Sequence, residues 1–245
     1  MNVWYMNGAG NNFAVIDARG VTVDMSKTAI MLCENGKYDG FMALDESDIA
    51  DIKLHFYNND GSRAEMCGNG ARCICRFAYD NGIVDEKMTV ETDAGIVEGE
   101  RISESVYRIR LNDVKKMELD DLYGFDYTVV GVPHVAIACD ELEFDSANQL
   151  LDRAREIRNQ KNANVNFYAK INESTVRILT YERGVEDFTL ACGTGSGAVA
   201  AILFKRGIID GHEVILQNQG GNLKIVMTPN GALYLEGGAD VDSIK

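Results

Sequence analysis

Two cysteines, Cys67 and Cys192, stand directly before a Gly-X-Gly segment that opens a helix-like stretch. A helix N-terminus leaves backbone N–H groups unpaired and carries about half a positive charge, so we expect it to favour a thiolate there. The glycines let a ligand approach the backbone, and the unpaired amides can hold a carboxylate. Two such helix starts facing one another would present one sulfur to each face of a substrate α-carbon. An amino-acid epimerase needs that arrangement.

The two cysteines belong to an internal repeat of about half the chain. Residues 66–71 return 125 positions later as residues 191–196, and the segment that starts at Gly8 returns from Gly131. A period this long is typical of a duplicated two-lobed protein and not of a solenoid. The repeat also makes a catalytic role for both cysteines more probable than simple packing, which is the usual role of a single cysteine.

The elements that would position these cysteines recur in each half. β-branched and aromatic residues predict strands, and apolar stretches that end at glycine signals predict helices. We predict an α/β (α+β) fold of two pseudosymmetric lobes, 1–118 with Cys67 and 119–245 with Cys192, each with sheet around a central helix. The expected elements are strands at 53–57 and 176–181, central helices at 71–79 and 196–205, and a surface helix at 146–161.

The remaining cysteines, at 33, 73, 75 and 139, lack a glycine-rich context, and we assign them to packing. A zinc site at Cys67, Cys73 and Cys75 is the competing interpretation. Their spacing, with no nearby histidine, does not match structural zinc sites, and we predict no metal.

Polar residues precede both cysteines at almost the same distance, in segments 58–62 and 181–184. A turn and an exposed charge pair would explain them without function. Their equivalent placement favours a pocket: Arg183 can bind a carboxylate through two hydrogen bonds, and Glu182 can bind an ammonium. His134 ends a turn that mirrors the turn after Gly8, and we weigh a role beside a cysteine against a structural role.

Composition excludes several classes of protein. With 245 residues, 46% of them hydrophobic, the chain can form a sizeable core, and its apolar runs are too short to span a membrane. A formal net charge of −14 argues against nucleic acid as a partner. The N-terminus shows no secretory signal, so we expect a cytoplasmic protein.

Along essentially its whole length the sequence resembles the diaminopimelate epimerase family. The matching segments are 8–13 (GAGNNF), 58–62 (NNDGS), 65–73 (EMCGNGARC), 131–134 (GVPH), 164–167 (NVNF), 182–185 (ERGV), 191–195 (ACGTG) and 219–221 (QGG).

The resemblance implies two α/β lobes, each a curved mixed β-sheet around a central helix, that interconvert LL- and meso-2,6-diaminopimelate without pyridoxal phosphate or metal. It implies a place in lysine and peptidoglycan biosynthesis and a homodimer. The implied acid–base pair is Cys67 and Cys192, with His134 and Glu182 tuning the thiols. The implied substrate contacts are Asn11, Asn58, Gly68, Asn69, Asn164, Glu182, Arg183, Gly193 and Thr194.

Three positions depart from the family pattern. Val132 stands where many members have Asn, Asn12 where many have Asp, and one residue is added between Glu182 and Cys192. These changes leave the two thiols intact but bear on the substrate. A racemase of another amino acid on the same fold therefore stays open as an alternative.

Two other classes explain less of the sequence. The segment 193–197 is similar to a nucleotide-binding loop, but the full G-x-G-x-x-G pattern and its acidic partner are missing. A non-catalytic thiol switch would need the two cysteines and would leave Glu182, Arg183 and His134 without a role.

Overall fold

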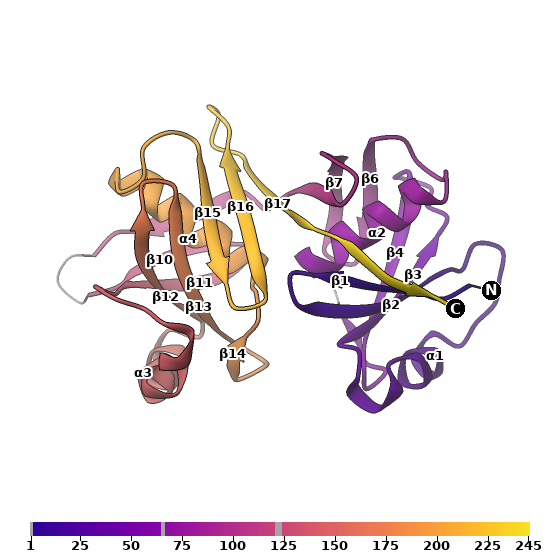
Figure 1. Ribbon diagram of the computed structural model, residues 1–245, viewed down its shortest axis with the longest axis horizontal. Helices are drawn as coiled ribbons and strands as arrows, with labels where there is room; N and C mark the ends of the chain where they lie inside the picture. The colour runs from indigo at the N-terminus through magenta and orange to yellow at the C-terminus, as the bar shows by residue number, and fades with distance from the viewer. Residues whose placement is uncertain (1, 65–66, 121–123) are drawn as a thin grey trace. The chain divides into compact units, whose positions relative to one another are not determined.

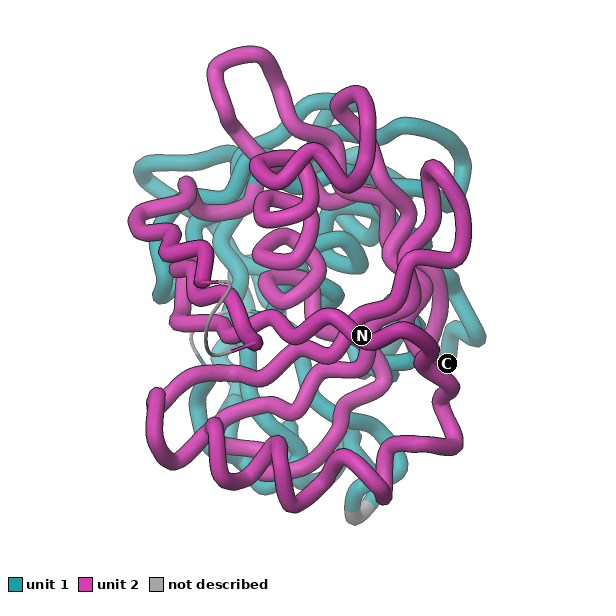
Figure 2. The backbone as a smooth tube through the Cα atoms, turned by 90° about the vertical axis from the view of Figure 1, so that its left-hand side faces the viewer, with its two compact units in different colours: residues 1–110, 237–245 teal, residues 111–236 magenta. Residues whose placement is uncertain are grey.

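The computed structural model describes residues 2–64, 67–120 and 124–245. The chain forms two compact units, coloured separately in Figure 2. The first contains the chain up to Arg110 together with Gly237–Lys245, and the second contains Leu111–Glu236.

The first unit is built around a mixed sheet whose chain order is two strands, a helix, three strands, a helix and three strands. Its pairs β2–β3 and β4–β6 are parallel and are joined by crossovers that contain α1 and α2, and its other pairs are antiparallel. The bounds are β1 Trp4–Gly8, β2 Asn11–Asp17, α1 Met25–Leu32, η1 Glu34–Gly36, β3 Gly40–Asp45, β4 Ile52–Asn58, β5 Arg63–Ala64, α2 Gly68–Asp80, β6 Lys87–Thr92, β7 Gly95–Arg101, β8 Val106–Arg110 and β18 Asp240–Ile244.

The second unit repeats this order. Its parallel pairs are β11–β12 and β13–β15, and the crossovers contain α3 and α4. The duplication predicted from the repeat is therefore present in the topology. The bounds are β9 Val114–Glu118, β10 Asp126–Val130, β11 Val132–Ala138, η2 Phe144–Ser146, α3 Ala147–Lys161, β12 Asn164–Asn172, β13 Thr175–Glu182, β14 Asp187–Thr189, α4 Gly193–Arg206, β15 Glu213–Asn218, β16 Gly221–Met227 and β17 Leu233–Gly238.

The compact units differ from the simple halves 1–118 and 119–245, and one strand in each unit explains the difference. The first strand of each repeat has an extra antiparallel neighbour: β18 beside β1, and β9 beside β10. The second unit takes this strand from the segment that joins the repeats, whereas the first takes it from the C-terminus. Part of the expected joining region, residues 121–123, lies outside the described residues.

A mostly buried helix lies among the strands of each unit, as predicted (Figure 1). Both helices are longer than expected and begin immediately after their cysteine. Ala71, Ile74 and Ala78 of α2, and Ala198 and Ile202 of α4, are fully buried. Within the described residues, no helix is long and apolar enough to cross a membrane.

The crossovers that contain α1 and α3 lie on the side of each sheet opposite its central helix. Ala29 of α1 packs with Ala14 and Phe41, and Ala154 of α3 packs with Phe167 in the corresponding cluster. The predicted helix 146–161 is α3, and the predicted strands 53–57 and 176–181 lie within β4 and β13.

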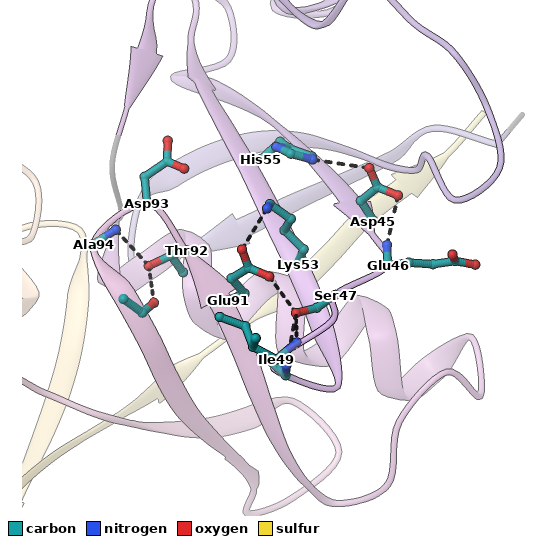
Figure 3. Close-up of polar contacts among 12 residues, drawn as sticks. Asp45, Glu46, Ser47, Ile49, Lys53, His55, Glu91, Thr92, Asp93 and Ala94 are labelled. Atoms are coloured by element: carbon teal, nitrogen blue, oxygen red, sulfur yellow. Dashed lines mark hydrogen bonds and ion pairs between the residues drawn. The ribbon is translucent and has the colours of Figure 1, made fainter.

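Polar contacts fasten the short parallel pair β4–β6 in the first unit (Figure 3). Lys53 on β4 donates to Glu91 on β6 at 2.7 Å, and Glu91 also accepts the Ser47 hydroxyl at 2.6 Å. The Thr92 hydroxyl donates to the Gly95 carbonyl at 2.7 Å and closes the turn into β7. These contacts fix the strand that follows the central helix.

Candidate active site

Cys67 is the residue directly before α2. Its backbone is extended, with φ −131° and ψ 125°, and its carbonyl accepts the Ala71 amide at 2.8 Å. The residue is partly exposed. Cys67 therefore occupies the N-cap position, where the helix leaves amides unpaired and favours negative charge. Glu65 and Met66, which precede it in the family pattern, lie outside the described residues.

Cys192 occupies the same position before α4, with φ −118° and ψ 113°. Its sulfur accepts the Gly195 amide at 3.3 Å and lies 3.6 Å from the Thr194 hydroxyl. The residue is only 6% exposed. The helix start thus holds this sulfur directly, through one backbone amide and one side-chain hydroxyl.

The surroundings of Cys192 oppose its ionisation. Burial raises the pKa of the thiol, and the nearby charge of Glu182 raises it further, although Thr194 and Gly195 act in the other direction. The helix N-terminus alone predicts a lowered pKa, and that prediction is wrong for Cys192 because desolvation and a neighbouring carboxyl outweigh two hydrogen bonds. Cys192 is held as a thiol.

Glu182 ends β13 and lies beside Cys192. Its carboxyl accepts the Thr189 hydroxyl from β14 at 2.5 Å, and it interacts with the Cys192 thiol. Burial raises the pKa of Glu182, and these two contacts oppose the rise. A carboxyl beside a thiol, with its pKa raised by burial, is suited to accept and return the proton of that thiol.

Arg183 and Asn164 are fastened to each other next to Glu182. The Asn164 side-chain oxygen accepts the Arg183 amide at 2.8 Å, and the guanidinium donates to the Asn162 carbonyl at 3.1 Å. In the part of the chain that the structure describes, no carboxylate pairs with this guanidinium. Its remaining donors can bind a carboxylate ligand.

His134 lies inside β11 and does not end a turn. Val130 and Val132 pair across the hairpin, so only Gly131 lies in the turn. The strand therefore begins at Val132, two residues before His134. His134 is fully buried, and burial, with a smaller effect of the Arg183 charge, lowers its pKa to about 3. The imidazole is therefore neutral at physiological pH.

In the first unit, Asn69 joins the start of α2 to β2. Its side-chain amide donates to Asn11 at 2.7 Å, and the Asn11 amide donates to Asp39 at 3.2 Å. The guanidinium of Arg72 donates to Asn69 at 3.1 Å. Asn69 and Asn11, both predicted site residues, are thus in contact beside Cys67.

Asn58 differs from the other predicted residues of its unit. It ends β4, and its side chain is exposed and donates to the Ser62 hydroxyl at 2.9 Å, inside its own turn. Asn11 and Asn69 thus lie at the start of α2, whereas the side chain of Asn58 bonds within its own turn.

Three polar residues near the helix starts have no role in the sequence-based prediction: Arg72, Asn166 and Thr180. All are 2% exposed or less. Two signals could have found Arg72 and Asn166, and none points to Thr180. A charged residue inside an apolar central helix points to Arg72, and the period of two in a strand places Asn166 on the same face as Asn164.

The other cysteines are packing residues or lie apart from the helix starts. Cys73 and Cys75 are buried in α2, where burial raises the pKa of each to about 12, and Cys33 follows α1 with a pKa raised to about 11. Cys139, half-buried, follows β11. Among the described residues, no cluster of His, Cys, Asp and Glu could hold a metal ion.

A sheet closed around a helix that begins at a cysteine, present twice in one chain, defines a racemase-like α/β fold. Solved structures share it. A phenazine biosynthesis protein of the PhzF family from Bacillus anthracis superposes with a TM-score of 0.76 at 16% identity, covering 100% of this chain and 98% of that one. A probable proline racemase from Agrobacterium radiobacter gives 0.70 at 14% identity, covering 100% and 92%.

The sequence comparison is more specific than the fold. The diaminopimelate epimerase family model matches residues 3–107 and 127–241. A diaminopimelate epimerase from Archaeoglobus fulgidus is 38% identical over 96% of this chain and 91% of its own. The chain belongs to the diaminopimelate epimerase family, as its motifs predict, and it is an enzyme of the isomerase class.

Proposed function

We propose that this enzyme interconverts LL- and meso-2,6-diaminopimelate by inverting one α-carbon, with Cys67 and Cys192 as the two acid–base groups. One observation carries the proposal: in both repeats a cysteine is the N-cap of the central helix and is followed by Gly-X-Gly. Family membership supports the substrate.

The helix starts would bind the reacting carboxylate. The backbone amides of Gly68, Asn69, Gly193 and Thr194 lie in the first turns of α2 and α4, where they have no intrahelical acceptors. Donors fixed in this way stabilise the negative charge that develops when an α-proton leaves. The α-proton of an amino acid is so weakly acidic that this stabilisation is essential.

The proton moves between the two sulfurs and the α-carbon. The thiolate of Cys67 removes the α-proton and becomes a thiol, while the thiol of Cys192 gives its proton to the opposite face and becomes a thiolate. The raised pKa of Cys192 favours this assignment for the free enzyme. When the meso isomer binds the free enzyme, in which Cys192 is a thiol, Glu182 would accept the proton of Cys192 so that this sulfur can act as the base.

The remaining polar residues would bind the rest of the substrate. Arg183 has donors available for a carboxylate, and Asn11, Asn58 and Asn164 would contact the substrate from the ends of strands. His134 would act beside a thiol or a substrate carboxylate. We assign these roles from the family motifs and from the position of each residue near its helix start.

The enzyme would act in the cytoplasm as a homodimer and would need no cofactor. Its reaction would belong to lysine and peptidoglycan synthesis. Lobes 1–118 and 119–245 would close on the substrate and exclude water.

Proton NMR of LL-diaminopimelate in heavy water tests the proposal directly. With the reduced enzyme we expect deuterium at the α-position and formation of the meso isomer. Cys67→Ala and Cys192→Ala should each abolish epimerisation, whereas Cys139→Ala, the matched control, should retain it. Exchange in another amino acid but not in diaminopimelate would instead support the alternative racemase, and exchange in none would exclude a catalytic role.

A further inference from the structure

Three polar side chains meet in the interior of the second unit, beneath the start of α4. His134, Asn166 and Thr180 come from the neighbouring strands β11, β12 and β13, and each is 2% exposed or less. Asn166 lies directly opposite Thr180 in the antiparallel register. Buried polar groups are costly unless they are hydrogen-bonded, so their bonding pattern carries information.

The Val135 carbonyl fixes the orientation of the Asn166 side-chain amide, and the Thr180 hydroxyl, which can donate or accept, then donates to its oxygen. The Asn166 nitrogen lies 2.8 Å from the Val135 carbonyl, which can only accept, and the Asn166 oxygen lies 2.9 Å from the Thr180 hydroxyl. Exchanging the oxygen and nitrogen would place two acceptors together at Val135. The network therefore fixes the assignment.

The second proton of the Asn166 nitrogen determines the tautomer of His134. This nitrogen lies 3.3 Å from Nδ1 of His134. A donor at that position requires Nδ1 to carry a lone pair, so the proton of the neutral ring is on Nε2. The Nε2 atom is buried, and within the described residues it has no hydrogen-bond partner.

The positive charge that acts on the His134 ring favours an anion as the partner of the Nε2–H group. This charge belongs to Arg183, and the first turn of α4 lies against the same network. A Cβ built on Gly195 would meet the Asn166 oxygen at 2.5 Å and the Cys192 sulfur at 3.2 Å. Asn166 thus touches the helix start that holds the proposed catalytic thiol.

We propose that Asn166, held in place by Thr180, is a positioning residue that locks His134 as the neutral Nε2–H tautomer, so that His134 donates a hydrogen bond to a substrate carboxylate. His134 then moves no proton in the reaction and is not a base. The tautomer follows from the network alone, whereas its use in catalysis rests on the proposed function.

Nitrogen-15 NMR of the histidine rings measures the tautomer without any activity. The chain has three histidines, and a His134→Gln variant assigns the signals of His134. Between pH 5 and 8 we expect a protonated Nε2 and an unprotonated Nδ1. A protonated Nδ1, or averaged signals from two exchanging tautomers, would overturn the proposal even if the enzyme proved to be an epimerase.

A pair of variants at Thr180 separates positioning from packing. Thr180→Val keeps the shape of the side chain but removes the hydroxyl that holds Asn166 in place, whereas Thr180→Ser keeps the hydroxyl. We expect Thr180→Val to give mixed tautomers and to lower kcat about tenfold, with Thr180→Ser close to wild type in both. Equal spectra for the two variants would contradict the positioning role.

Asn166→Asp should reverse the tautomer. A carboxylate beside Nδ1 accepts and does not donate, so the His134 proton should move to Nδ1. Adding meso-diaminopimelate to the wild type should shift the Nε2 proton signal, since a carboxylate acceptor becomes available. An unchanged Nε2 signal in a protein that epimerises diaminopimelate would refute the donor role while leaving the proposed function intact.

Discussion

The two units share a backbone arrangement, but the strand residues beneath the first turns of their central helices differ. They are polar in the second unit and apolar in the first. The second unit has the polar group His134, Asn166 and Thr180 on three neighbouring strands. The strand registers identify the equivalent positions in the first unit, where β2 pairs with β3 and β3 with β4 in the same way. The residues at those positions are Phe13, Met42 and Phe56.

The first unit has its polar group on the helix. Arg72 is fully buried, five residues beyond Cys67, and its guanidinium reaches back to Asn69 at 3.1 Å and to the Gly68 carbonyl at 3.4 Å. The equivalent residue of α4 is Gly197. Buried polar groups thus lie near one helix start on the helix itself and near the other on the sheet.

This difference shows that duplication preserved the backbone and the cysteines but not their electrostatic surroundings. Burial lowers the pKa of Arg72, and the attraction of Cys73, Cys67 and Cys75 opposes that change. The guanidinium therefore favours an anion near Cys67, whereas burial and Glu182 disfavour one at Cys192. A two-base reaction needs one thiolate and one thiol, and the two surroundings favour that division.

Removing the charge of Arg72 should change kcat more than any other substitution that tests the difference between the two helix starts. We expect Arg72→Met to lower kcat about 100-fold, because a fixed positive group near the proposed thiolate is lost. Stability should change by less than about 1 kcal/mol, since an apolar side chain of similar length fits a buried site without a desolvation cost. Steady-state kinetics and urea unfolding measure the two effects.

Arg72→Lys is the matched control, because it keeps the charge but loses the planar fork. Its kcat should lie between those of Arg72→Met and the wild type. An Arg72→Met enzyme that unfolds would assign the residue to structure, and one with full activity would remove the electrostatic difference between the two helix starts.

Much of this frame was predictable from the sequence. The position of Cys67 and Cys192 before Gly-X-Gly predicts a helix start, and the spacing of the repeat predicts the duplication. The β-branched and aromatic residues located β4 and β13. These features depend on local backbone chemistry, which a linear pattern records.

The surroundings of the cysteines were not predictable in the same way. The apolar neighbours of Arg72 mark it as unusual but do not show what its guanidinium contacts, and Thr180 resembles any strand threonine until Asn166 lies opposite it. The pKa of Cys192 depends on burial and on Glu182, ten residues away in sequence. Such features arise from strand register and packing, and the local sequence does not encode them directly.

Equivalent glycines in the two helix starts offer a smaller test. An added Cβ at Gly195 would lie 2.5 Å from the Asn166 oxygen, which two strands hold in place, but at Gly70 it would meet the flexible Met42 sulfur at 3.0 Å. We expect Gly195→Ala to destabilise the protein by about 2 kcal/mol through overpacking. Gly70→Ala should cost less than about 1 kcal/mol, because alanine also favours the helix.

Urea unfolding of both variants, at equal protein concentration, measures the difference. Equal losses of stability would mean that the polar residues beneath α4 shift as readily as the apolar residues beneath α2 to accommodate an added methyl group. A larger loss for Gly70→Ala would reverse the comparison and show that the interior of the first unit is the more rigid.

Glu182 and Asn58 end the equivalent strands β13 and β4, and only Glu182 can carry a charge. We expect this difference to have the smallest effect on stability. Burial raises the pKa of Glu182 above the value near 4.3 of an unfolded chain. As pH rises through this window the unfolded state ionises first, so the carboxyl lowers stability at pH 7 and has no such effect below about pH 4.

Glu182→Gln makes this position neutral, as it is at Asn58, and keeps an oxygen for the Thr189 hydroxyl. We expect a higher melting temperature than wild type at pH 7, a difference that vanishes as pH falls below about 4, and a loss of epimerase activity at every pH. Thermal unfolding from pH 3.5 to 8 measures it. A variant less stable than wild type at pH 7 would show that the contacts of the charged carboxylate outweigh its burial, so that Glu182 stabilises the fold.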